Sequence, residues 1–224
     1  MSGQRRKKSM PLEVERKYLH VDFAVLRRTL YDLGARTPGA HFESNWVFDT
    51  PDIQLFESRR LLRLRSQEWP DAVRHVLTLK LPASQSGHFK VREERELEVA
   101  DGAAMRAVLE GLGYAVGARY EKIREPWLLE DVEVALDVLP FAEVVELEGE
   151  AAHIERAATR LGLDKAEIST KSYHQLHQDW RRLHNLSPDF SFVFDAERRS
   201  DWRRRLGLAG KEPHSGDRPD ASKA

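Results

Sequence analysis

Charged residues in this chain occupy every second position of short segments, and this alternation constrains the fold more than any other feature. In the segment PLEVERKYL near the N-terminus, the period of an extended strand places Glu13, Glu15 and Lys17 on one face. Leu12, Val14, Arg16 and Tyr18 lie on the opposite face. A strand of this kind must bury its apolar face against other elements and give its charged face a polar environment.

A charged face of the same kind recurs in at least five further segments, and seven short alternating segments in all follow the first, separated by turn sequences such as TPD, WPD and SQSG. Together with residues 12–19, these segments predict eight strands in one domain. The further strands are expected over residues 45–49, 60–66, 74–81, 89–99, 118–125, 131–138 and 143–149.

Helical periodicity appears in only a few segments between these strands. Two of them carry the same boundary signals, an aspartate as N-cap and a glycine as stop: Asp22 with Gly34, and Asp101 with Gly113. The helices are expected over residues 22–33, 101–112, 151–161 and about 170–184.

The composition excludes several classes of function. Charged residues make up 33% of the 224 residues, but the formal net charge is only -1, so the overall charge indicates neither a nucleic-acid nor a membrane partner. The absence of cysteine excludes disulfides, thiolate metal sites and cysteine nucleophiles. No apolar run reaches the ~18 residues of a membrane span, and no apolar stretch of a signal peptide follows the basic N-terminus. We therefore expect a cytoplasmic protein and leave its oligomeric state open.

The two ends of the chain differ in character from its middle. Residues 1–10 predict a disordered basic tail, and residues 11–184 a single domain. Residues 185–224 form a C-terminal extension whose Pro-, Gly- and Ser-rich end is expected to be disordered. Within it, residues 201–208 suggest a short helix with three consecutive arginines on a solvated face.

The charged faces of the strands carry almost only Glu, Asp, Arg and Lys. An antiparallel sheet with one face in water explains each segment taken alone, but such a face usually also carries Thr, Ser and Gln. Helices that pack on the apolar side would turn the charged face inward and produce a barrel with a polar interior. Charges inside a barrel are costly unless they are paired or hold a ligand. A polyanion accompanied by divalent metal ions suits such a mixture of cations and carboxylates.

The order of these charged segments resembles that of a known family. Glu13-x-Glu15-x-Lys17 resembles the ExExK signature of the CYTH superfamily, also called triphosphate tunnel metalloenzymes. LLRLR, LTLK, VREERELEV, YEKIRE, ALDVLPFAEVVELEG and STKSYHQL resemble its later motifs in the same order and extend the similarity over residues 11–180. The resemblance implies an α+β fold, an eight-stranded antiparallel closed β-barrel with helices packed outside. The chain departs from the family at LPFAE, where a glycine-rich turn is common.

The resemblance also implies the roles of individual residues around a triphosphate and Mg²⁺ or Mn²⁺, with two ions expected. Glu15 and Lys17 would act in catalysis. The triphosphate-binding set would be Lys17, Arg63, Arg65, Lys80, Arg92, Lys122, Arg124 and Lys171. The metal-binding set would be Glu13, Glu15, Glu94, Glu96, Asp137, Glu146 and Glu148.

Some residues have a competing interpretation. Lys171 lies on an expected helix, where a lysine is usually solvated, and Glu96 would also suit a structural pair with a neighbouring arginine. His174 and His177 have a spacing that suits a metal site, but no third ligand accompanies them. We therefore expect both histidines on the surface.

The leading functional interpretation is a metal-dependent hydrolase that cleaves inorganic tripolyphosphate to pyrophosphate and phosphate. Three alternatives stay open: a thiamine triphosphatase, a class IV adenylyl cyclase, and a non-catalytic module that binds polyphosphate or nucleotides. The expected partner is in each case a small molecule bearing a triphosphate. The P-loop signature GxxxxGK[ST] is absent, so a P-loop mechanism is not expected.

Overall fold

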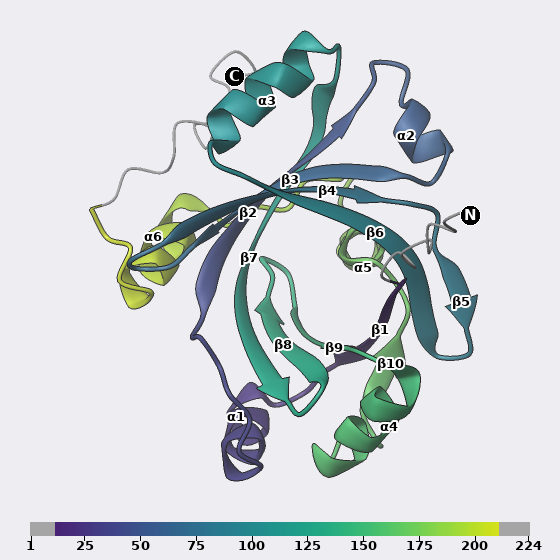
Figure 1. Cartoon of the computed structure of the whole chain (residues 1–224), viewed down its shortest axis with the longest axis vertical. Coiled ribbons are helices and arrows are strands. Elements are labelled where there is room, and N and C mark those ends of the chain that lie inside the picture. The colour runs from purple at the N-terminus through teal and green to yellow at the C-terminus, as the bar shows by residue number, and fades with distance from the viewer. Residues whose placement is uncertain (1–11, 211–224) are drawn as a thin grey trace, which may run out of the picture.

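The computed structural model describes residues 12–210, and the side chains of Leu12, Glu13 and Gln85 are not part of that description. The tail predicted over residues 1–10 and the disorder predicted at the C-terminal end therefore lie outside the described residues. Within residues 12–210 the chain forms one antiparallel sheet with helices around it (Figure 1).

The sheet closes on itself and forms the predicted eight-stranded barrel. Strand β1 pairs with β9 on one side and with β6 on the other, which joins the two ends of the strand order. Around the barrel the strands are β1 (Leu12–Leu19), β9 (Glu143–Glu148), β8 (Val132–Val138), β7 (Ala115–Leu129), β2 (His41–Asp49), β3 (Leu61–Glu68), β4 (Val73–Lys80) and β6 (Phe89–Val99). Two short strands, β5 (Ser84–Ser86) and β10 (Glu167–Ser169), extend β6 and β1.

Two strands are longer than their predicted segments. Strand β2 begins at His41 because Phe42 and Trp46 face the core, but Ser44 between them interrupts the apolar face in the sequence. Strand β7 continues to Leu129 through Pro126, a residue that usually ends a strand. Proline is tolerated here because the pairing of β7 with β2 ends at Arg124, so that among the described strands Pro126 pairs with β8 alone.

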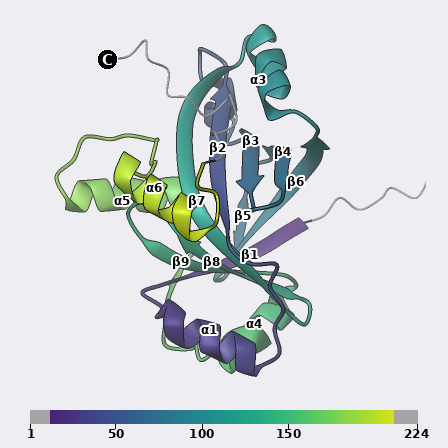
Figure 2. The same cartoon turned by 90° about the vertical axis from the view of Figure 1, so that its left-hand side faces the viewer.

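The helices lie outside the barrel and bury its apolar faces. Helices α1 (Phe23–Asp32) and α4 (Ala151–Arg160) lie side by side under one side of the barrel (Figure 2). Leu30 of α1 and Ile154 of α4 are fully buried in the same cluster as Leu147 of β9. Asp22 caps α1 as predicted, accepting hydrogen bonds from the backbone of residues 24 and 25. The helices are thus held by apolar contacts to the outward faces of the strands.

The remaining helices lie at the edges of the barrel. Helix α3 (Gly102–Gly111), capped by Asp101, packs against β3, and α2 (Gln54–Glu57) is a single turn between β2 and β3. Helix α5 (Tyr173–Leu183) lies at one end of the barrel, where it is visible through the opening in Figure 1 and projects to one side in Figure 2. Within the described residues, no helix is long and apolar enough to cross a membrane.

The C-terminal extension packs against the outside of the barrel. Phe192 forms a bridge with Tyr120 of β7, and Phe194 is fully buried. Helix α6 (Ala196–Arg205) begins five residues earlier than predicted, with Asp195 as its N-cap. The expectation that all three arginines are solvated is wrong for Arg203, which forms a bidentate ion pair with the buried Glu68.

Candidate functional site

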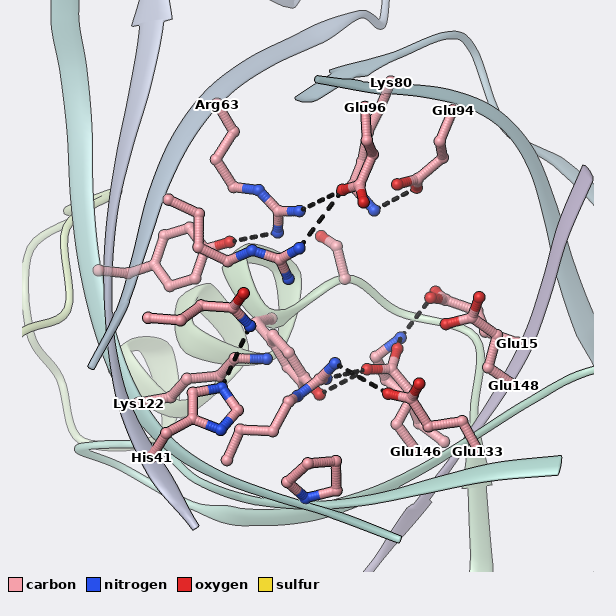
Figure 3. A pocket seen from close by; sticks show the side chains of 18 of the residues that line it. Glu15, His41, Arg63, Lys80, Glu94, Glu96, Lys122, Glu133, Glu146 and Glu148 are labelled. Carbon is pink, nitrogen blue, oxygen red and sulfur yellow. Dashed lines mark hydrogen bonds and ion pairs between the residues drawn. The ribbon is translucent and has the colours of Figure 1, made fainter. Parts of the chain in front are cut away.

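The interior of the barrel holds a cavity of about 800 Å³ (Figure 3). Among the described residues, ten arginines or lysines and six glutamates line it, and they come from every strand of the barrel except β2, which contributes His41. The inward positions are those that the alternation of charged residues predicted. The barrel therefore encloses a polar, densely charged chamber of a size typical for small-molecule sites.

Lys17 lies at the centre of an ion-pair network on β1 and β9. Its Nζ is 2.7 Å from Glu15 Oε1 and 2.6 Å from Glu146 Oε1, and Glu15 also pairs with Lys90. Burial alone would lower the pKa of Lys17, but Glu146 and Glu15 outweigh it and raise the pKa above its usual value. Lys17 therefore remains an ammonium group, which can bind an anion but cannot act as a base.

Asp137 on β8 organises a second group of cations from a fully buried position. Arg124 donates from Nη2 to Asp137 Oδ2 over 2.6 Å, and Lys122 Nζ lies 3.2 Å from the same oxygen. The hydroxyl of Tyr173 also donates to this carboxylate, over 2.5 Å. Burial favours a raised pKa, but Arg124 and Lys122 hold the pKa of Asp137 below its usual value. Asp137 is thus a charged anchor behind the cavity wall.

Glu43 on β2 is a third buried anchor, and the sequence analysis missed it. Its carboxylate accepts hydrogen bonds from His41 and Gln67, each over 3.0 Å, and lies 3.4 Å from Lys122. Against the effect of burial, Lys122 and Arg65 hold the pKa of Glu43 well below its usual value. His41, Glu43 and Asn45 are two residues apart, so they share one face of the strand. This period is the signal that would have assigned Glu43 to the interior of the barrel.

Three arginines of β3 and β6 line the cavity, and groups of the described chain pair with only some of their nitrogen atoms. Arg63 donates to the hydroxyl of Tyr120 over 3.0 Å, and both Arg63 and Arg65 lie within 3.6 Å of Glu96. The Nε atoms of Arg63, Arg65 and Arg92 are buried and make no hydrogen bond within the described part of the chain. Buried guanidinium N–H groups without an acceptor are unusual in proteins and suit an anionic ligand.

Helix α5 adds two residues to the cavity, Tyr173 and His174, directly after its N-cap Ser172. The ring of Tyr173 lies over the ammonium groups of Lys17 and Lys122, at 5.2 and 5.4 Å. Surface positions were predicted for His174 and His177, and both predictions are wrong. His177 is buried and His174 lies in the cavity wall against Tyr120, because the C-terminal extension covers this side of the helix.

Burial lowers the pKa of His174 to about 4. The unfolded chain binds a proton at this residue below pH ~6.5, whereas the folded chain does so only near pH 4. We therefore expect His174 to reduce the free energy of unfolding as the pH falls from about 6.5 to 4, by up to ~3 kcal/mol. Urea unfolding of the wild type and of His174→Gln at pH 7 and pH 5 measures this contribution of His174 to the free energy of unfolding. The free energy of unfolding should fall less for the variant than for the wild type between pH 7 and pH 5. An equal fall in both proteins would contradict the lowered pKa of His174.

The structure brings most of the predicted site residues together. Twelve of them line the cavity, and Asp137 lies immediately behind its wall. Lys171 is not among them: its side chain is 55% exposed and pairs with Asp179, because it precedes the N-cap of α5 and points outward. The side chain of Glu13 lies outside the described residues. The predicted residues in the wall are Glu15, Lys17, Arg63, Arg65, Lys80, Arg92, Glu94, Glu96, Lys122, Arg124, Glu146 and Glu148.

The carboxylates in the wall have the chemistry to hold a hard divalent cation. Glu15 lies opposite Glu148 in the pairing of β1 with β9, and Glu146 is two residues away on the same face. Oxygen donors of this kind suit Mg²⁺ and Mn²⁺. In the described part of the chain, however, no three acidic or histidine side chains converge on one point. Glu15 and Glu146 instead contact Lys17.

A sequence profile of the CYTH domain matches residues 11–176, which is most of the chain. The chain belongs to the CYTH family. No curated protein matches it. Several solved structures share the CYTH fold with this chain at low sequence identity.

Three of these structures illustrate the similarity. A candidate adenylate cyclase from Vibrio parahaemolyticus is 20% identical and has a TM-score of 0.62, over 75% of this chain and 98% of its own. A protein from Pyrococcus horikoshii is also 20% identical, with a TM-score of 0.63 and the same coverage. A candidate adenylyl cyclase from Hippeastrum with a dominant triphosphatase activity is 18% identical, with a TM-score of 0.56, over 76% of this chain and 96% of its own.

Proposed function

We propose that this CYTH protein is a metal-dependent hydrolase of triphosphates and that inorganic tripolyphosphate is its minimal substrate. The observation that carries the proposal is the cavity inside the barrel, whose described lining includes ten arginines or lysines, Arg63, Arg65 and Arg92 among them. A chain of phosphates supplies acceptors for such donors along its whole length. Tripolyphosphate needs nothing from the site beyond these cations and a metal.

The cations of the cavity wall come from different sides of the barrel. Arg63, Arg65 and Arg92 come from β3 and β6, and Lys17, Lys122 and Arg124 from β1 and β7. A phosphate chain in the barrel would thus be held from several sides. Glu43, Asp137 and Glu146 fix the cations in place before the substrate binds, which lowers the cost of reorganisation in the reaction.

The reaction is an in-line displacement at the terminal phosphorus. The oxygen of a water molecule forms a bond to phosphorus while the bond from phosphorus to the bridging oxygen breaks, and pyrophosphate leaves with that bridging oxygen. The water loses a proton to a carboxylate, for which we propose Glu15. Lys17, which remains protonated, stabilises the negative charge that develops on the phosphate oxygens.

Glu15, Glu146 and Glu148 are the residues that we propose to hold Mg²⁺ or Mn²⁺, and Glu94 and Glu96 offer a second group of oxygen donors on β6. A bound metal ion would neutralise charge on the phosphate oxygens. Against the effect of burial, Lys17 and Arg124 hold the pKa of Glu146 well below its usual value, so Glu146 needs to lose no proton to take up a metal ion.

Release of orthophosphate and pyrophosphate from tripolyphosphate, thiamine triphosphate and ATP tests the proposal, in the presence of Mg²⁺ or Mn²⁺ and again with a chelator. We expect metal-dependent release of orthophosphate from tripolyphosphate. Pyrophosphate together with cyclic AMP from ATP would instead identify an adenylyl cyclase. Tight binding of all three compounds without turnover would identify a binding module.

Two variants sharpen this assay. Arg63→Ala removes a buried cation of the cavity wall and should reduce kcat/KM for tripolyphosphate on the order of 100-fold. Lys171→Ala is the matched control, because the exposed Lys171 pairs with Asp179 outside the cavity. Unchanged activity is expected for Lys171→Ala, and a loss equal to that of Arg63→Ala would return Lys171 to the triphosphate-binding set.

A further inference from the structure

The C-terminal extension pairs with one edge of the barrel. Among the described strands, β8 pairs with β7 only from Ile123 onward, and the extension lies beside the earlier part of β7. The backbone N–H of Phe192 donates to the carbonyl of Arg119 over 3.0 Å, and the carbonyl of Phe192 accepts from the N–H of Glu121 over 3.0 Å. These two hydrogen bonds fix Phe192 directly beside Tyr120.

Buried contacts hold the extension on the C-terminal side of Phe192. The carboxylate of Glu121 is buried, and it accepts hydrogen bonds from the backbone N–H of Phe194 over 3.0 Å and from Nε of Arg199 over 3.1 Å. The ring of Phe194 is fully buried in the main apolar cluster. The position of Phe192 is thus set by the fold and does not depend on a bound ligand.

The ring of Phe192 packs against two residues of the cavity wall. It stacks on the ring of Tyr120, with 5.0 Å between centroids, and it meets the ring of His174 edge-on at 5.2 Å. Both Tyr120 and His174 line the cavity, whereas Phe192 is not among the described residues of the lining. Phe192 is 4% exposed. It therefore lies immediately behind the wall and supports it.

Tyr120 connects this support to a cation of the cavity. Its hydroxyl accepts a hydrogen bond from Nη1 of Arg63 over 3.0 Å, and Nη2 of Arg63 contacts Thr78 over 3.3 Å. The hydroxyl carries no charge, so it directs the guanidinium group without neutralising it. A hydrogen bond weakens steeply as its geometry changes, so the direction of Arg63 depends on where the ring of Tyr120 lies.

We infer that Phe192 is a positioning residue of the triphosphate site: its ring holds Tyr120, and the hydroxyl of Tyr120 directs Arg63 toward the phosphates. The inference rests on the proposed function, in which Arg63 binds the triphosphate. The CYTH profile ends at residue 176, so this support comes from a segment beyond the matched domain. A flat aromatic ring is required at residue 192, because a branched aliphatic side chain offers Tyr120 no face to stack on.

Steady-state kinetics with tripolyphosphate tests the inference in Phe192→Leu, Tyr120→Phe and the double variant. In each single variant KM should rise about tenfold, because Arg63 loses a fixed direction. A smaller amount of folded protein would instead lower the apparent kcat at an unchanged KM. The double variant should also show a rise of about tenfold, since both changes act on the same hydrogen bond. A rise of about 100-fold would show independent roles and would overturn the inference.

Phe194→Leu is the matched control, since Phe194 is a buried phenylalanine of the same extension but is not among the described residues of the cavity wall. It should leave KM unchanged. An equal rise of KM in Phe194→Leu and Phe192→Leu would show a general loosening of the extension and contradict a specific role of Phe192. Tyr120→Phe keeps the ring, so wild-type KM in that variant would refute the inference even where Phe192→Leu does not fold.

A second measurement needs no substrate. NMR spectroscopy with isotopically labelled arginine reports how fast the guanidinium group of Arg63 rotates. Rotation should be faster in Phe192→Leu and Tyr120→Phe than in the wild type and in Phe194→Leu, and equal rates in all four proteins would overturn the inference. If the wild type hydrolyses no triphosphate, the proposed function fails, but these rates still decide whether Phe192 positions Arg63.

Discussion

Glu146→Gln is expected to reduce kcat/KM for tripolyphosphate on the order of 100-fold while the protein remains folded. Glu146 contacts Lys17 at 2.6 Å, Arg124 at 2.6 Å and the hydroxyl of Tyr173 at 3.1 Å. Glutamine keeps the size of the side chain but removes the charge that positions both cations and that a metal ion would need. Steady-state kinetics at varied Mg²⁺ concentration measures the effect.

The metal dependence separates the two roles of Glu146. If Glu146 holds the metal ion, the variant needs a higher Mg²⁺ concentration for half-maximal activity. If it only positions Lys17 and Arg124, kcat falls at an unchanged metal requirement. Glu98→Gln is the control, since Glu98 also lies on the inward face of a strand but is exposed and pairs with Arg74. Wild-type activity in Glu146→Gln would remove Glu146 from the site.

Asp137→Asn is expected to destabilise the fold by roughly 3–5 kcal/mol. The carboxylate of Asp137 is fully buried and holds Arg124, Lys122 and the hydroxyl of Tyr173. Its removal leaves two buried cations with fewer counter-charges, and such a loss costs more than the ion pair itself contributes. The free energy of unfolding in urea at pH 7 measures the change.

Glu133→Gln provides the comparison on the same strand. Glu133 lies 3.9 Å from Arg124, but its side chain is 49% exposed, so its removal should cost less than ~1 kcal/mol. Similar small losses in both variants would show that Glu43 and Glu146 suffice to compensate Lys122 and Arg124. The anchoring role of Asp137 would then be wrong.

The sequence predicted the barrel because the face on which a strand residue lies depends only on its own segment. Alternation assigns each strand residue to one of two faces without any knowledge of its neighbours in space. This is why Glu15, Arg63 and Lys122 could be assigned to the interior from their own segments. The same period places Lys90 on the charged face with Arg92, and Lys90 lines the cavity, but it was left out of the predicted site residues because the family motif begins after it.

The histidines of α5 show where reasoning from neighbouring residues failed, and Lys171, just before this helix, does not line the cavity. His174 and His177 were expected on the surface because no third metal ligand accompanies them, but the return of the chain at Phe192 covers both rings. Lys171 follows the family motif, but its side chain points outward because Ser172 begins the helix directly after it. Neither outcome can be read from the residues beside these positions.

The sequence by itself therefore determined which side chains face the interior of a closed, charged barrel, since a period of two residues decides that question strand by strand. Only the tertiary structure decided which carboxylate holds which cation. That choice depends on the register between strands and on the closure of β1 against β6, which join residues far apart in the chain. The buried positions of Glu43 and Asp137 depend on those long-range pairings, which act between strands rather than along the chain.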